Sequence, residues 1–183
     1  MKKVKETSKN LEKKNIITNA FFKLLSQKRL VSRISIKEIT DLAHINRSTF
    51  YSYFKNINEI LDYWANDVYV TLDNIELEPN KESIKNYFTY IFNIVDNNEQ
   101  RLRNMLVSDD FSFMCLKFIK HIRKRIDQLS INEKVKTKLH ILIEGYFIEL
   151  ISDFKHKVVG NVDTLRDIAF EVLDKILNEI KTI

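Results

Sequence analysis

The order of apolar and polar residues along the chain predicts helices almost throughout. Apolar side chains recur three and four residues apart, which is the period of a helix that buries one of its faces. The breaks between these runs fall at clusters of polar residues, at the one proline and at Gly160. We expect helices over residues 8–27, 35–43, 46–54, 58–75, 83–95, 99–107, 109/110–129, 130/132–157 and 162/163–180.

Turn-forming residues are too scarce for a β-rich protein. The 183 residues include two glycines, Gly145 and Gly160, and one proline, Pro79. Strands joined by tight turns need such residues at short intervals, whereas helices do not. The fold class we expect is therefore all-α, and hydrophobic residues, at 44% of the chain, are sufficient for a substantial core.

The segment from Ser35 to Phe54 predicts two short helices joined by a tight turn. Ser35 and Glu38 have the spacing of a capping box, in which each side chain satisfies a backbone N–H group of the other residue. Asn46 is a favoured N-cap residue for the second helix. Such a pair is typical of a helix-turn-helix, whose second helix enters the DNA major groove. The alternative is a helical hairpin in an ordinary bundle, because capping boxes begin many helices.

Positive charge is concentrated in the first third of the chain. Residues 1–60 hold 13 Lys and Arg against 5 Asp and Glu, a net charge of +8. Residues 61–183 hold 17 against 20, a net charge of −3. A basic segment joined to an acidic one is expected of a nucleic-acid-binding head on a body with another task. A solvated, lysine-rich tail is the alternative, since basic tails are common.

Residues 16–61 resemble the DNA-binding domain of the TetR family of bacterial transcriptional regulators. The second helix of that family typically reads T-x-x-x-I-A-x-x-A-G-V-S. Here Ser35, Ile39-Thr40 and residues 43–46 (Ala-His-Ile-Asn) stand at the matching positions. The third helix typically reads T-[FLY]-Y-x-[HY]-F, which residues 49–54 match as Thr-Phe-Tyr-Ser-Tyr-Phe.

Two positions depart from the pattern of the family. His44 replaces the glycine of the turn. That position needs a left-handed backbone, which histidine tolerates better than most other residues with a side chain. Ile57 stands where the family has a lysine, so one phosphate contact is lost.

The resemblance implies how the head would contact DNA. Lys37 would contact backbone phosphates, and Arg47 would take either a guanine or a phosphate. Phe50 and Phe54 are expected to belong to the core. The residues implied to contact DNA are Ser35, Lys37, Arg47, Ser48, Thr49, Tyr51, Tyr53 and Lys55.

The resemblance also implies the organisation and the activity of the whole chain. A three-helix helix-turn-helix head, residues 1–57, would precede a helical regulatory and dimerisation domain, residues 58–183. The implied protein is a transcriptional repressor that binds a palindromic operator in double-stranded DNA as a homodimer and is released by a small-molecule effector. The alternative is a DNA-binding regulator controlled by a partner protein, with no small-molecule ligand.

Residues 139–180 carry apolar stripes that look wider than one buried face requires. In proteins that the chain resembles, such helices form a four-helix interface between two subunits. The alternative is that each helix is sunk in its own core. A dimer is favoured because one recognition helix reads too few base pairs. The interface residues we expect are Ile143, Phe147, Leu150, Ile151, Phe154, Leu165, Ala169, Val172, Leu173 and Ile176.

The middle of the chain is rich in aromatic residues and methionine, such as Trp64, Phe88 and Met105. These side chains line pockets for apolar ligands, and they also fill ordinary cores. We therefore expect a small apolar or aromatic effector, and we assign no residue to its binding.

No pattern in the sequence predicts catalysis, a cofactor or a metal site. The four histidines lack a metal-binding spacing, and no glycine-rich phosphate loop occurs. Cys115 is the one cysteine, so it has no partner for an internal disulfide. No apolar run reaches the ~18 residues of a membrane helix, and no secretory signal is present. We expect a cytoplasmic protein that is not an enzyme.

Overall fold

The computed structural model describes residues 8–28, 30–106, 112–156 and 162–180. Within these ranges all regular structure is helical, nine α-helices and one short 3-10 helix, so the expected all-α class is confirmed. The chain divides into two compact units, Met1–Val68 and Tyr69–Ile183, which are described separately.

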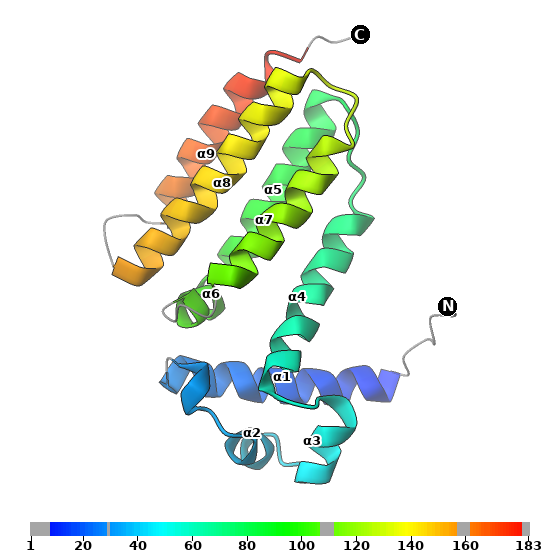
Figure 1. Ribbon diagram of the computed structural model, residues 1–183, viewed down its shortest axis with the longest axis vertical. Helices are drawn as coiled ribbons and strands as arrows, with labels where there is room; N and C mark the ends of the chain where they lie inside the picture. Colours follow the sequence, from blue (N-terminus) through cyan, green and yellow to red (C-terminus); the bar gives the residue numbers. More distant parts are fainter. Residues whose placement is uncertain (1–7, 29, 107–111, 157–161, 181–183) are drawn as a thin grey trace. The chain divides into compact units, whose positions relative to one another are not determined.

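The first unit contains the predicted helix-turn-helix. Helices α2 and α3 lie on one side of the long helix α1 (Figure 1). The core between them is apolar, and Phe21, Ile39 and Phe50 are completely buried in it. The elements are α1 (Ser8–Lys28), the 3-10 helix η1 (Val31–Arg33), α2 (Ile36–Leu42), α3 (Arg47–Tyr53) and the first part of α4 (Ile57–Asn74).

The first unit extends further along the chain than we predicted. We placed its end at residue 57, but the division falls inside α4, after Val68. Aromatic contacts explain the difference. The ring centroids of Phe54 and Tyr63 are 5.8 Å apart, and those of Phe22 and Trp64 are 5.6 Å apart. The start of α4 therefore belongs to the core of the head.

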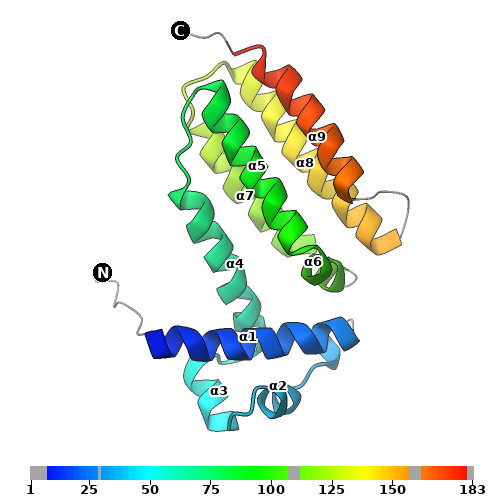
Figure 2. The same cartoon turned by 180° about the vertical axis from the view of Figure 1, so that it is seen from behind.

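The second unit is a helical bundle. Helices α5, α7, α8 and α9 run alongside one another, and α8 and α9 are neighbours in both views (Figures 1 and 2). Rings of Phe92, Tyr146 and Phe170 meet in its core, with centroids 4.7 Å and 4.9 Å from that of Phe92. The unit holds the end of α4, α5 (Lys81–Asn97), α6 (Glu99–Leu106), α7 (Ser112–Asp127), α8 (Glu133–His156) and α9 (Val162–Leu177).

Most helix starts in the second unit lie within two residues of the prediction. Helix α5 begins two residues earlier than expected, because the Asn80 side chain accepts the N–H group of Ser83 at 2.8 Å. The side chain of Asn132 likewise accepts the N–H group of Lys134 at the start of α8. The predicted start of α7 at Asp109 or Asp110, and the predicted turn at residues 160–161, lie outside the described residues.

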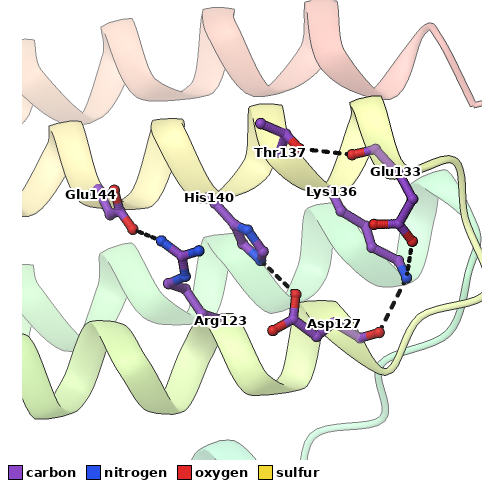
Figure 3. A network of polar contacts seen from close by, with 7 residues as sticks. All are labelled: Arg123, Asp127, Glu133, Lys136, Thr137, His140 and Glu144. Atoms are coloured by element: carbon purple, nitrogen blue, oxygen red, sulfur yellow. Dashed lines mark hydrogen bonds and ion pairs between the residues drawn. The ribbon is translucent and has the colours of Figure 1, made fainter.

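Polar contacts join α7 to α8 (Figure 3). Arg123 forms an ion pair with Glu144, and Asp127 Oδ1 lies 3.2 Å from His140 Nε2. Lys136 donates to the backbone carbonyl of Asp127 at 3.1 Å. These contacts hold one flank of α7 against α8.

Arg125 of α7 holds the C-terminal end of α4. Its guanidinium donates to the carbonyl oxygens of Leu72 at 2.9 Å and of Ile75 at 2.6 Å. The last carbonyls of a helix have no partner within the helix, so a cation there supplies hydrogen bonds and suits the helix dipole. His121 adds a contact to Asp73 at 3.0 Å and stacks on Tyr69. Within the described ranges, no helix has the length and apolar character needed to cross a membrane.

Candidate functional sites

A capping box fixes the start of α2, as predicted. The Ser35 hydroxyl accepts the N–H group of Glu38 at 3.3 Å, and the Glu38 carboxylate accepts the N–H group of Ser35 at 3.0 Å. Lys28, at the end of α1, forms an ion pair with the same carboxylate and donates to the carbonyl of Arg33. The Lys28 ammonium and the Ser35 donors lower the pKa of Glu38 to about 2. This cluster joins α1, η1 and α2.

The turn between α2 and α3 has the left-handed residue that the sequence predicts. His44 has a φ of 52°. Among the described residues, it is the one residue other than glycine whose φ is positive. The N–H group of Ile45 then donates to the carbonyl of Thr40 at 3.0 Å and closes the turn. Asn46 is the N-cap residue of α3, with an extended backbone, as predicted, although its side chain makes no capping hydrogen bond.

Helix α3 has one buried and one exposed side. Phe50 is completely buried and Phe54 is 3% exposed, which confirms their predicted place in the core. The rings of Phe50 and Tyr51 meet edge to face at 5.6 Å, and Tyr51 remains 54% exposed. Arg47 and Ser48 are also exposed. The side chains aimed at solvent are thus a cation, a hydroxyl and an aromatic ring.

The other predicted DNA contacts surround this exposed side. Lys37 and Lys55 are exposed, and Thr49 is half-buried. Two hydroxyls already have partners. That of Ser35 donates to Glu38 at 2.8 Å, and that of half-buried Tyr53 donates to Asn10 of α1 at 3.5 Å. Ser35 and Tyr53 therefore hold the local structure of the head, whatever else they contact.

A shallow hollow of about 480 Å³ lies over the turn. Its lining includes His44, Asn46 and Thr49, together with Lys13 of α1. We did not single out Lys13 from the sequence, because it is far from the motif along the chain and no local pattern distinguishes it from its lysine neighbours. It adds a cation beside the start of α3.

The residues predicted to form a dimer interface are mostly core residues. Seven of them are at most 6% exposed: Ile143, Phe147, Leu150, Phe154, Ala169, Leu173 and Ile176. A side chain that is already buried in its own chain has no surface left for a second subunit, so the prediction is wrong for these seven. Ile151 and Leu165 are half-buried, and Val172 is 38% exposed.

A different set of apolar residues reaches the surface of α8 and α9. Ile141 is 65% exposed and Ile148 is 61% exposed. Gly145 stands between them at helical spacing, and a Cβ there would meet nothing within 4 Å. Ile168 of α9, at 53%, and Val172 are exposed as well. Apolar residues occupy both faces of α8. From the sequence pattern we assigned the dimer interface to the face that is buried within the chain.

Comparison with known proteins identifies the architecture. No protein-family model and no curated protein matches the chain. Among solved structures, a dihydroxyacetone kinase operon activator, DhaS, is similar with a TM-score of 0.67 and 18% identity over 92% of this chain and 96% of that one. A TetR transcriptional regulator from Streptococcus agalactiae 2603V is similar with a TM-score of 0.58 and 22% identity over 92% and 95%. The chain has the fold of TetR-type transcriptional regulators. The fold that the resemblance implied is thereby confirmed.

Proposed function

We propose that the protein is a TetR-like transcriptional regulator that binds a palindromic operator as a homodimer and acts as a repressor released by a small-molecule effector. The observation that carries the proposal is the two-sided helix α3. Phe50 and Phe54 anchor it in the core, while Arg47, Ser48 and Tyr51 are left to solvent next to a left-handed turn. A short helix held in this way presents side chains to the DNA major groove.

Electrostatics supports the same assignment. The exposed cations Lys37, Arg47 and Lys55 lie in the unit that carries the excess positive charge of the chain. The Glu38 carboxylate, which would repel phosphates, forms an ion pair with Lys28. Lysine and arginine side chains that neutralise phosphates supply most of the sequence-independent part of DNA affinity.

The exposed apolar residues of α8 and α9 support a homodimer. Ile141, Gly145 and Ile148 recur at i, i+4 and i+7, and Ile168 and Val172 stand four apart on the neighbouring helix. Contiguous exposed apolar surface on a folded protein marks an interaction site. Two antiparallel copies of this helix pair would bury it, and a two-fold dimer would place two α3 helices on a palindromic site.

Two buried hydroxyls support a small-molecule effector. The hydroxyl oxygens of Tyr87 and Tyr146 are buried and have no hydrogen-bond partner among the described residues. Burial raises the pKa of Tyr87 to about 12, so its phenol stays protonated. Buried polar groups are normally paired, and an unpaired phenol in an aromatic core is a suitable anchor for one polar group of a largely apolar ligand.

Selection from a duplex library tests the proposal. The full chain would be incubated with duplexes that carry a random core about 30 bp long, enough for two half-sites one helical turn apart. We expect a palindromic sequence to be enriched. Arg47→Ala and Tyr51→Ala should each bind the enriched duplex about tenfold more weakly, the size of one lost base contact.

The matched control for these variants is Lys175→Ala, which removes an exposed cation from α9. Its affinity for the enriched duplex should stay within about twofold of that of the wild type, a free-energy difference of about 0.4 kcal/mol. If no sequence is enriched, or if both head variants bind as the wild type does, the assigned function is wrong.

A further inference from the structure

Helix α7 concentrates positive charge within an acidic part of the chain. Residues 61–183 have a net charge of −3, yet α7 carries five Lys and Arg against one Asp. These are Lys117, Lys120, Arg123, Lys124, Arg125 and Asp127. The DNA contacts described above do not use these charges.

The charges of α7 divide into an inner and an outer set. Arg123 and Asp127 turn toward α8, where they meet Glu144 and His140 (Figure 3). Arg125 caps the end of α4 and is therefore also engaged. Lys120 and Lys124 are exposed, and neither makes a hydrogen bond or an ion pair with any described residue. Positive charge therefore remains uncompensated on the outer side of α7.

A groove of about 610 Å³ lies beside these lysines. Tyr69 of α4 and Leu116 and Ile119 of α7 contribute apolar surface to it, and Leu116 is 61% exposed. Lysine side chains lie along apolar surface with their methylene stems and keep the ammonium in water. The groove consequently has apolar walls and a cationic rim.

We propose that this groove binds an amphipathic acidic helix of a partner protein. The apolar face of the helix would cover Leu116 and Ile119, and its flanking carboxylates would meet the lysines. Lys120 and Lys124 stand four residues apart, about 6 Å along α7. Carboxylates at the same helical spacing on a neighbouring helix would lie opposite them.

The chemistry of the lining favours this occupant over other anions. A small anion needs convergent groups in an enclosed site, whereas these lysines are spread along an open helix face. A nucleic-acid backbone offers no apolar side chain to cover Leu116, which is 61% exposed in the groove. Because Tyr69 belongs to α4, a helix in the groove would contact the end of α4 as well as α7.

A peptide of defined pattern tests the proposal without any DNA, so its result is independent of the function proposed above. The probe is a fluorescein-labelled peptide of about 18 residues, five helical turns, with leucines at i, i+3, i+4 and i+7 and glutamates flanking them. Fluorescence anisotropy would be measured with the full chain at about 50 mM salt, where screening is weak. The wild-type chain should bind it at least tenfold more tightly than a scrambled peptide of equal composition.

Substitutions locate the contact. The double variant Lys120→Glu/Lys124→Glu should weaken binding at least tenfold, and Leu116→Ser about threefold. The control Lys134→Glu/Lys175→Glu makes the same change in net charge at exposed positions of α8 and α9 and should bind as the wild type does. Lack of binding by the wild type, or equal binding of the scrambled peptide, would overturn the proposal. The proposal would also be overturned if the control variant weakened peptide binding as much as the α7 double variant does. A random duplex that loses affinity with the α7 variant, while the peptide fails to bind, would assign the face to nucleic acid instead.

Discussion

The two units of this chain expose different surfaces. Among the described residues of the first unit, the large apolar side chains that are well exposed are Leu11 and Tyr51. The second unit exposes six, and four of them, Ile141, Ile148, Ile168 and Val172, lie on α8 and α9. The first unit also holds the excess of cations. The head is thus suited to a polyanion, and the outer faces of the body are suited to other protein surfaces.

Neighbouring residues of α8 have opposite surroundings. Phe147 is 3% exposed and packs against Tyr146 and Phe118, whereas Ile148 is 61% exposed. One holds the chain together, and the other is available to a second chain. Substitutions on the two faces of α8 should therefore have different effects.

The largest effect is expected from Phe147→Ala. Removal of a buried phenylalanine loses its transfer free energy and leaves a cavity, so the free energy of unfolding should fall by about 3–5 kcal/mol. Ile148→Ala, measured by the same urea denaturation of dilute, monomeric protein, should cost less than about 1 kcal/mol, as for other surface positions. Equal losses would show that the two faces of α8 have been assigned wrongly.

A somewhat smaller effect is expected on subunit association. Ile141→Glu/Ile148→Glu would place carboxylates in an apolar contact, where burial of unpaired charge is unfavourable. The dimer dissociation constant should rise at least a hundredfold, about 3 kcal/mol, in analytical ultracentrifugation. Leu116→Glu, at an equally exposed position on α7, should leave the constant unchanged. A wild-type monomer, or a dimer that survives the double change, would contradict the interface.

In the head, Ser35→Ala should lower the free energy of unfolding by about 1 kcal/mol, the usual cost of a lost N-cap.

The Glu38 carboxylate adds a pH dependence to the stability of the head, because its pKa lies at about 2 in the folded chain, below the ordinary 4.5. Its contribution is complete above about pH 4.5 and is lost as the pH falls toward 2. Wild type and Glu38→Gln should therefore differ most near neutral pH and converge in acid. A difference that grows on acidification would refute this role of Glu38.

The smallest effect is expected at the turn. A left-handed backbone costs a residue with a Cβ about 1–2 kcal/mol, and glycine avoids this cost. Glycine also has a larger conformational entropy in the unfolded chain, which offsets part of the stabilisation. His44→Gly should therefore raise the free energy of unfolding by about 0.5 kcal/mol, measured by thermal denaturation. His44→Val should lower it, because a branched side chain fits this backbone poorly. A stabilising valine would be incompatible with φ 52° at this position.

The sequence predicts local features better than the packing of separate helices, for a physical reason. The capping box and the turn at His44 are local features, and each depends on residues a few positions apart. The contact of Phe54 with Tyr63 and the position of Lys13 depend on how separate helices pack, which no local pattern records. The outer face of α8 could not be chosen from periodicity, because isoleucines occupy that face as well as the inner one.

The most direct test of the DNA-binding head is the salt dependence of its affinity for duplex DNA. Log affinity should fall linearly with log salt, and each neutralised phosphate contributes about 0.9 to the slope. The triple variant Lys37→Gln/Arg47→Gln/Lys55→Gln should make the slope shallower by two to three such contributions, about 2–3. A slope that is unchanged from the wild type would mean that these three exposed cations do not meet the phosphates, and the proposed DNA-binding face would be wrong.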